Sequence, residues 1–234
     1  MFFDWTYLVI VMPFVLLSLW ASTNVNSTFK RYANQHSIRR ITGAQAAQKV
    51  LSANGVSGVK IERISGNLTD HFDPRTNVIR LSDGVYDATS TAAIGVACHE
   101  AGHAVQYAKS YAPIKLRAAI VPVTNFASKL AMPLILLGLI LTFLENFSFT
   151  LVYIGIACFG VAVLFQIITL PVEFNASRRA MQAIDSTGIL TDEEQRGARK
   201  TLTAAALTYV AATAVALAQL LRLLIIFGGR RNDD

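Results

Sequence analysis

His99, Glu100 and His103 are the residues whose types and spacing could do chemistry in this sequence. On a helix, His99 and His103 are four residues apart, so their side chains lie one above the other on the same face. Two neutral imidazoles at this spacing can bind one Zn²⁺. Glu100 lies toward the open side of such a metal, where it could accept a proton from an activated water. The motif therefore predicts a zinc site that catalyses hydrolysis.

The alternative is a structural helix that carries two hydrogen-bonded histidines. Histidine is scarce, with four in the chain, and two of the four form this pair, which favours the metal site. Residues 89–106 contain no proline and many small side chains, so they predict one helix with Thr89 or Ser90 as its N-cap. Cys98 would then point away from the metal face as a small buried residue.

The composition indicates an integral membrane protein. Hydrophobic residues make up 53% of the chain and charged residues only 15%, whereas soluble domains average about 25% charged. The net charge of +6 suits an anionic lipid surface. The basic residues flank apolar runs and are not interleaved with aromatics, which argues against a nucleic-acid partner. The two cysteines lie far apart in apolar stretches and predict no disulfide framework.

Four apolar stretches predict the helices that must hold the motif at a membrane. The first, 5–20, has tryptophan at both ends and no basic residue before it, so we predict an uncleaved anchor and not a signal peptide. The next two, 118–144 and 150–170, are joined by a short polar loop and predict a hairpin. The fourth, 202–227, is interrupted by Arg222. It either spans the bilayer, packs against the site or lies in the interface.

The distribution of lysine and arginine predicts the orientation of these spans. Basic residues follow the first span at Lys30, Arg31, Arg39 and Arg40, whereas the hairpin loop contains none. By the positive-inside rule, the N-terminus lies outside and the polar section after it lies in the cytoplasm. The hairpin starts at the cytoplasmic face and returns to it. We therefore predict a multi-pass protein of the cell membrane with a cytoplasmic active site.

The polar section predicts two short strands, 56–64 and 77–82. In zinc peptidases of this construction, an edge strand beside the site pairs with the substrate backbone, and the second strand is a candidate for that role. The loop between them, 68–75, contains His71 and Asp73. It is either a capped turn or a loop near the zinc. In the second case His71 would stabilise an oxyanion, or Asp73 would orient a ligand.

Glu173 is the predicted third zinc ligand. It follows directly after the third span, on the membrane face near which the histidine pair lies. Two histidines, one glutamate and a water would complete a catalytic zinc site. Asn175 and Ser177, in the same segment, are candidates for contacts to the ligands or to the substrate. Glu173 could instead pair with a nearby arginine, and rival carboxylates, better explained as helix caps, are Asp185, Glu193 and Glu194.

Four motifs together resemble the YugP-type neutral zinc metallopeptidases, a bacterial membrane family of the gluzincin kind. The matching segments are Leu68-Thr-Asp-His-Phe-Asp-Pro74, Val78-Ile-Arg-Leu-Ser82, Val96-Ala-Cys-His-Glu-Ala-Gly-His-Ala-Val-Gln106 and Leu170-Pro-Val-Glu-Phe-Asn-Ala-Ser-Arg-Arg-Ala180. The resemblance implies one zinc per chain at His99, His103 and Glu173, with Glu100 catalytic. The family usually carries aspartate where this chain has Asn175, so the charge of that position is missing here.

The sequence as a whole predicts a mainly α integral membrane protein with a small cytoplasmic α+β metallopeptidase domain. The predicted segments are an N-terminal anchor (1–23), a metallopeptidase region with the His-Glu-x-x-His helix (24–118), a transmembrane hairpin (119–170), a third-ligand helix and cytoplasmic segment (171–203) and a C-terminal hydrophobic helix with its tail (204–234). The predicted function is a zinc metallopeptidase that hydrolyses peptide or membrane-protein substrates beside the lipid bilayer. The alternative is a catalytically silent membrane scaffold that keeps the fold; a transporter would need more ionisable residues within its spans.

Overall fold

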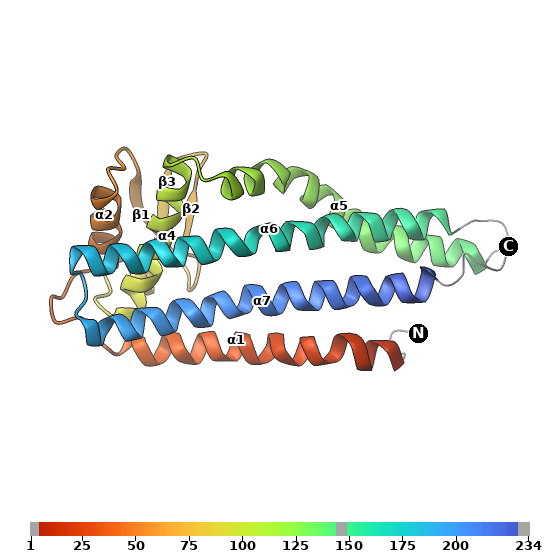
Figure 1. Cartoon of the computed structure of the whole chain (residues 1–234), viewed down its shortest axis with the longest axis horizontal. Coiled ribbons are helices and arrows are strands. Elements are labelled where there is room, and N and C mark those ends of the chain that lie inside the picture. Colours follow the sequence, from red (N-terminus) through yellow and green to blue (C-terminus); the bar gives the residue numbers. More distant parts are fainter. Residues whose placement is uncertain (1–4, 144–148, 229–234) are drawn as a thin grey trace. The chain divides into compact units, whose positions relative to one another are not determined.

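The computed structural model describes residues 5–143 and 149–228, and this part of the chain is mostly helical (Figure 1). Four of its helices are long and apolar enough to cross a membrane. A π-helical turn, Tyr7–Val11, precedes α1 (Met12–Ala33). The remaining elements are α2 (Gly43–Ala53), β1 (Lys60–Ile64), β2 (His71–Asp73), β3 (Val78–Ser82), α3 (Asp83–Tyr86), α4 (Thr91–Ala108), α5 (Ala112–Phe143), α6 (Thr150–Thr187) and α7 (Asp192–Gly228).

The chain divides into two compact units, each described here by itself. The apolar unit comprises residues 1–20, 116–170 and 209–234. The polar unit comprises residues 21–115 and 171–208, and it contains the whole sheet together with α2, α3 and α4. The hairpin loop at 145–149 lies, except for Phe149, outside the described residues.

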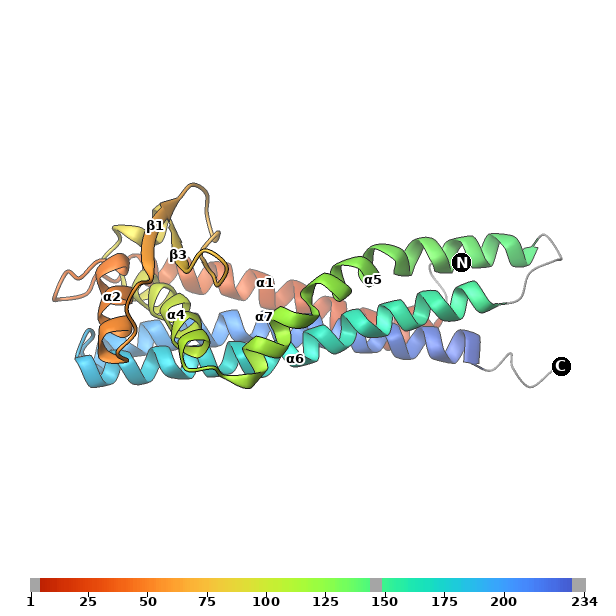
Figure 2. The ribbon, with the colours of Figure 1, turned by 90° about the horizontal axis from the view of Figure 1, so that it is seen from above.

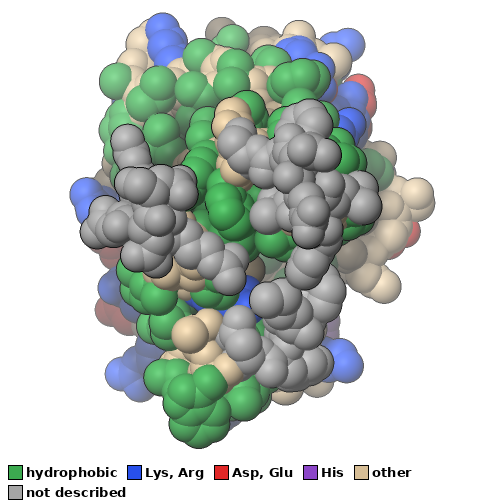
Figure 3. All heavy atoms as spheres, turned by 90° about the vertical axis from the view of Figure 1, so that its right-hand side faces the viewer, with side chains coloured by type: hydrophobic (Ala, Val, Ile, Leu, Met, Phe, Trp, Pro, Cys, Tyr) green, Lys and Arg blue, Asp and Glu red, His purple; other side chains and the backbone are tan. Residues whose placement is uncertain are grey.

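Small residues let the helices of the apolar unit approach closely. A Cβ atom on Gly155 of α6 would lie 2.8 Å from the carbonyl oxygen of Ala131 in α5. Glycine at such crossings is typical of helices that pack in a bilayer, where dispersion contacts replace the hydrophobic effect. The Arg222 guanidinium lies 5.4 Å from the ring centre of Tyr7, which gives this charge an aromatic neighbour in the unit. Figure 3 shows hydrophobic side chains on much of the face that the grey residues do not cover.

The sheet of the polar unit has the order β1-β3-β2, with β1 parallel and β2 antiparallel to β3. Its central strand is therefore β3, so this candidate for pairing with a substrate backbone is not an edge strand. The reason lies in the residues of β3, because Val78, Ile79 and Leu81 are all buried and a strand buried along its whole length sits inside a sheet. The edge strands are β1 and β2, so the backbone N–H and C=O groups that could pair with another chain lie on these two strands.

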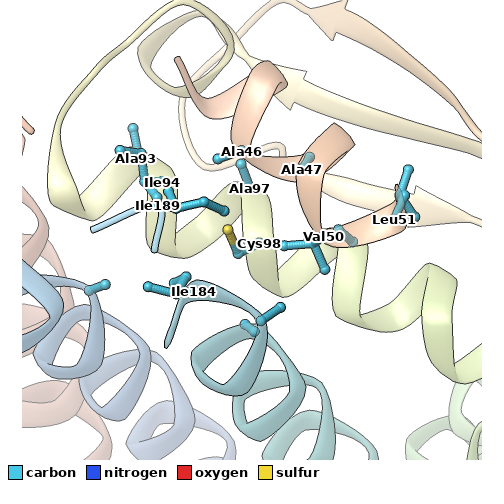
Figure 4. Close-up of a cluster of buried hydrophobic side chains, with 14 of the residues drawn as sticks. Ala46, Ala47, Val50, Leu51, Ala93, Ile94, Ala97, Cys98, Ile184 and Ile189 are labelled. Carbon is cyan, nitrogen blue, oxygen red and sulfur yellow. The ribbon is translucent and has the colours of Figure 1, made fainter. Parts of the chain in front are cut away.

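The core of the polar unit surrounds α4. Buried alanines and aliphatic residues of α2 pack on one side of α4, and Ile184 and Ile189 pack on another (Figure 4). Figure 2 shows α2 and α4 next to β1 and β3. The α4 helix begins after Ser90, whose hydroxyl accepts a hydrogen bond from the amide of Ala93. Cys98 belongs to this core, and burial raises the pKa of its thiol, so it is an inert packing residue.

Two local predictions differ from the structure. Residues 68–75 are not only a turn, because they contain β2, in which Phe72 packs at 6.1 Å from the ring of Tyr107. Pro171, directly after the third apolar stretch, predicts a break or a kink of the helix, but α6 continues through it to Thr187. A proline removes one backbone hydrogen bond at a cost of about 3 kcal/mol. The packing of the fully buried Val172 and Ala176 stabilises the helix where this hydrogen bond is missing.

Candidate metal centre

The α4 helix places His99 and His103 together, as expected for residues one turn apart. Their ring centroids are 4.7 Å apart and the rings meet edge to face. The side chain of Glu173 comes from α6 and approaches both rings. Its Oε2 atom lies 3.2 Å from His99 Nε2 and 3.5 Å from His103 Nε2. Within the described residues, these three form the group of histidine, cysteine and acidic side chains that could hold a metal ion.

The spacing of these atoms fits zinc. Bonds of about 2.0–2.1 Å in a tetrahedral site separate the ligand atoms by about 3.3–3.4 Å. The two measured separations, 3.2 and 3.5 Å, bracket that value. Two imidazoles and one carboxylate are also a donor set that zinc prefers, and three protein ligands leave a fourth position open for water.

The charges of the site favour a cation. Burial lowers the pKa of His103, but its hydrogen bond to Glu173 and the nearby charges of Glu100 and Glu173 outweigh burial and raise the pKa above its usual value. The carboxylates that raise this pKa are also the groups that would attract a metal ion. Because a zinc ligand must be a neutral imidazole, metal and proton compete for this ring.

Glu100 lies beside this group without being a member of it. It is only 8% exposed, yet its carboxylate forms no hydrogen bond or ion pair with any residue that the structure describes. Its charge acts on His103, whose pKa it helps to raise. The carboxylate oxygens could also accept a hydrogen bond from a water in the site.

The ring nitrogens that face away from Glu173 also have partners. His99 Nδ1 lies 3.0 Å from Ser177 Oγ. His103 Nδ1 lies 3.0 Å from Gln106 Oε1. Asn175 accepts a hydrogen bond from Gln106. Gln106 was not among the site residues predicted from the sequence; its position, three residues after His103 on the same helix, was the available signal.

His71 and Asp73 are not brought to the three ligands by any contact that the structure shows. His71 is exposed, and its Nδ1 lies 2.8 Å from the carbonyl oxygen of Thr69. Asp73 accepts hydrogen bonds from the amide of Arg75 and the hydroxyl of Thr76, which lower the pKa of its carboxyl. Both side chains thus bond locally around β2.

The rival carboxylates have other partners or face solvent. Glu194 is buried and accepts hydrogen bonds from the amides of Ile38 and Thr191, so it caps α7 and ties down the segment after α1. Asp185 is exposed and accepts from Gln195, and Glu193 is exposed. The predicted capping explanation holds for Glu194, although this cap is buried and not solvated.

Gly102 allows α6 to bring Glu173 this close to α4. A Cβ atom on Gly102 would lie 2.7 Å from the carbonyl oxygen of Ala176, so the two backbones touch here. Gly102→Ala is therefore expected to push the helices apart, lower the free energy of unfolding by about 1–3 kcal/mol and weaken zinc binding. Thermal unfolding in detergent and chelator competition would measure both effects.

Gly84→Ala is the matched control, because a Cβ atom there meets no atom within 4 Å. It should leave the melting temperature and the zinc affinity unchanged. Equal behaviour of the two variants would mean that the contact between Gly102 and Ala176 does not position Glu173.

Comparison with known proteins agrees with this centre. The family described as "Putative neutral zinc metallopeptidase" matches residues 7–228 of the chain. A relative from Bacillus subtilis (strain 168), named "Putative membrane protease YugP", is 47% identical over 218 residues, which cover 93% of this chain and 95% of the relative. No solved structure gives a match to the chain.

Proposed function

This chain belongs to the family of putative neutral zinc metallopeptidases, and we propose from that premise that it is an integral membrane zinc endopeptidase. The observation that carries the proposal is the group of His99, His103 and Glu173 at zinc-ligand separations. Beside it lies the buried carboxylate of Glu100, whose charge acts on His103. Its substrates would be peptides or membrane proteins, bound beside the lipid bilayer.

In this mechanism His99, His103 and Glu173 would hold the zinc, with Ser177 bonded to the ring of His99. Zinc, when bound, supplies a Lewis acid that polarises the substrate carbonyl and makes water acidic. Glu100 accepts the proton of the attacking water. It then delivers that proton to the leaving amine, so that the carboxylate is restored after each cleavage. Comparison of the wild-type protein with Glu100→Gln at equal zinc content tests this function.

We further propose that the site faces the cytoplasm. The support is the distribution of charge, since basic residues follow the first apolar helix and are absent from the hairpin loop. Single cysteines at positions 60 and 146, in a background with Cys98 and Cys158 replaced by alanine, would report the orientation. A membrane-impermeant maleimide added to intact cells is expected to label position 146 and not position 60.

Position 60 is a suitable probe because Lys60 is exposed in β1. After the cells are permeabilised, both positions should be labelled, which controls for poor reactivity. Labelling of position 60 alone in intact cells would place the site on the outer face of the membrane.

A further inference from the structure

Gln106 is a buried side chain beside the candidate metal centre that contacts both α4 and α6. It has no exposed surface. Its Oε1 lies 3.0 Å from His103 Nδ1, and its Nε2 lies 2.8 Å from the carbonyl oxygen of Val172 and 3.0 Å from Asn175 Oδ1. These partners join the C-terminal part of α4 to the turn of α6 that carries Glu173.

The orientation of the Gln106 amide follows from neighbouring groups that can only donate or only accept a hydrogen bond. The carbonyl of Val172 can only accept, so the NH₂ group of Gln106 must face it. Asn175 Oδ1 also accepts from Arg179 Nε at 2.8 Å, and a guanidinium can only donate. Asn175 therefore presents its oxygen to Gln106 as well, and both neighbours require the same amide orientation.

This orientation determines what His103 can do. With its NH₂ group used on α6, Gln106 can offer only its carbonyl oxygen to His103 Nδ1, so that nitrogen must carry a hydrogen. A neutral ring with its hydrogen on Nδ1 has its lone pair on Nε2, the atom 3.5 Å from Glu173. The hydroxyl of Ser177 imposes no such choice on His99, because a hydroxyl can donate or accept.

We propose that Gln106 is a positioning residue that selects the metal-binding tautomer of His103. The amide is held by Val172 and by the Arg179–Asn175 pair, and it keeps Nε2 of His103 free and directed at the ion. Such contacts to the ligands of a metal typically contribute 10- to 100-fold in affinity. This inference deepens the proposed function and rests on the zinc site formed by His99, His103 and Glu173.

Two substitutions test separately the amide oxygen of Gln106, which faces His103, and its NH₂ group, which faces Val172. Gln106→Met keeps a side chain of similar length but offers His103 no strong acceptor and Val172 no donor. Gln106→Glu keeps an acceptor for His103 Nδ1 and loses the donor to Val172. Both variants should melt at a lower temperature than the wild type in the zinc-free state, because both leave the carbonyl of Val172 unpaired.

Zinc affinity, measured by chelator competition on the full-length protein in detergent, distinguishes positioning from packing. Gln106→Met is expected to bind zinc about 10- to 100-fold more weakly, whereas Gln106→Glu should stay within about threefold of the wild type or bind more tightly. If both variants keep wild-type affinity, or both lose it equally, Gln106 only packs α4 against α6 and the inference is wrong. If the wild-type protein itself binds no zinc, the proposed function fails first.

Discussion

Replacing His99, His103 or Glu173 by alanine is expected to remove most of the zinc from the protein. Each of these side chains offers one of three ligand atoms to a metal ion, and a zinc site with only two protein ligands would lose the coordination that gives it affinity. The buried carboxylate of Glu173 also neutralises charge at the site, so its loss removes a ligand and an electrostatic attraction together. Zinc-to-protein ratios after gel filtration in detergent would measure the loss for each variant.

Asp185→Ala and Glu193→Ala are the matched controls for Glu173→Ala. Both residues are exposed acids of the polar unit, and neither lies in the group around the histidines. They should keep one zinc per chain and full activity. A Glu173→Ala protein with undiminished zinc, together with loss of zinc in either control, would show that Glu173 is not the third ligand.

Glu100→Gln is expected to keep its zinc and lose its turnover. Glutamine has the size of glutamate and can form hydrogen bonds, but it cannot accept the proton of the attacking water. The loss of a general base typically lowers the rate by about 10²- to 10⁴-fold. Initial rates of cleavage of an unstructured protein substrate, with zinc content measured on the same samples, would record the effect.

The same variant gives access to the substrate. Because the ligands of the zinc are intact, Glu100→Gln should still bind a substrate and could hold it for crosslinking at the membrane. Glu193→Gln makes the same chemical change at an exposed site of the polar unit and should cleave at the wild-type rate. Cleavage by Glu100→Gln at the wild-type rate would mean that Glu100 is not the general base, and no cleavage by the zinc-loaded wild type would favour the scaffold.

The parts of the centre that could be predicted from sequence are those fixed by local geometry. Helical spacing alone aligns His99 with His103, and the structure has them on α4 with rings 4.7 Å apart. Glu173 was predicted from the order of the apolar stretches, which returns the chain to one face of a membrane. The structure brings this carboxylate to both rings.

The parts that could not be predicted depend on how two helices meet. Gln106 reaches Val172 and Asn175 only because Gly102 lets α6 touch α4, and no local pattern contains that crossing. The hydrogen bond between Asn175 and Gln106 depends on the same crossing of the two helices. The position of a strand within its sheet is likewise set by pairing between distant segments.

The central claim is that this chain hydrolyses peptide bonds with a water that Glu100 deprotonates at a zinc held by His99, His103 and Glu173. The most direct measurement is cleavage of an unstructured protein in ¹⁸O-labelled water, with the products read by mass spectrometry. Wild-type protein carrying one zinc should produce fragments whose new C-termini contain ¹⁸O, and Glu100→Gln with equal zinc should produce at least about 100-fold less. No cleavage by the zinc-loaded wild type, or equal cleavage by both proteins, would contradict the claim.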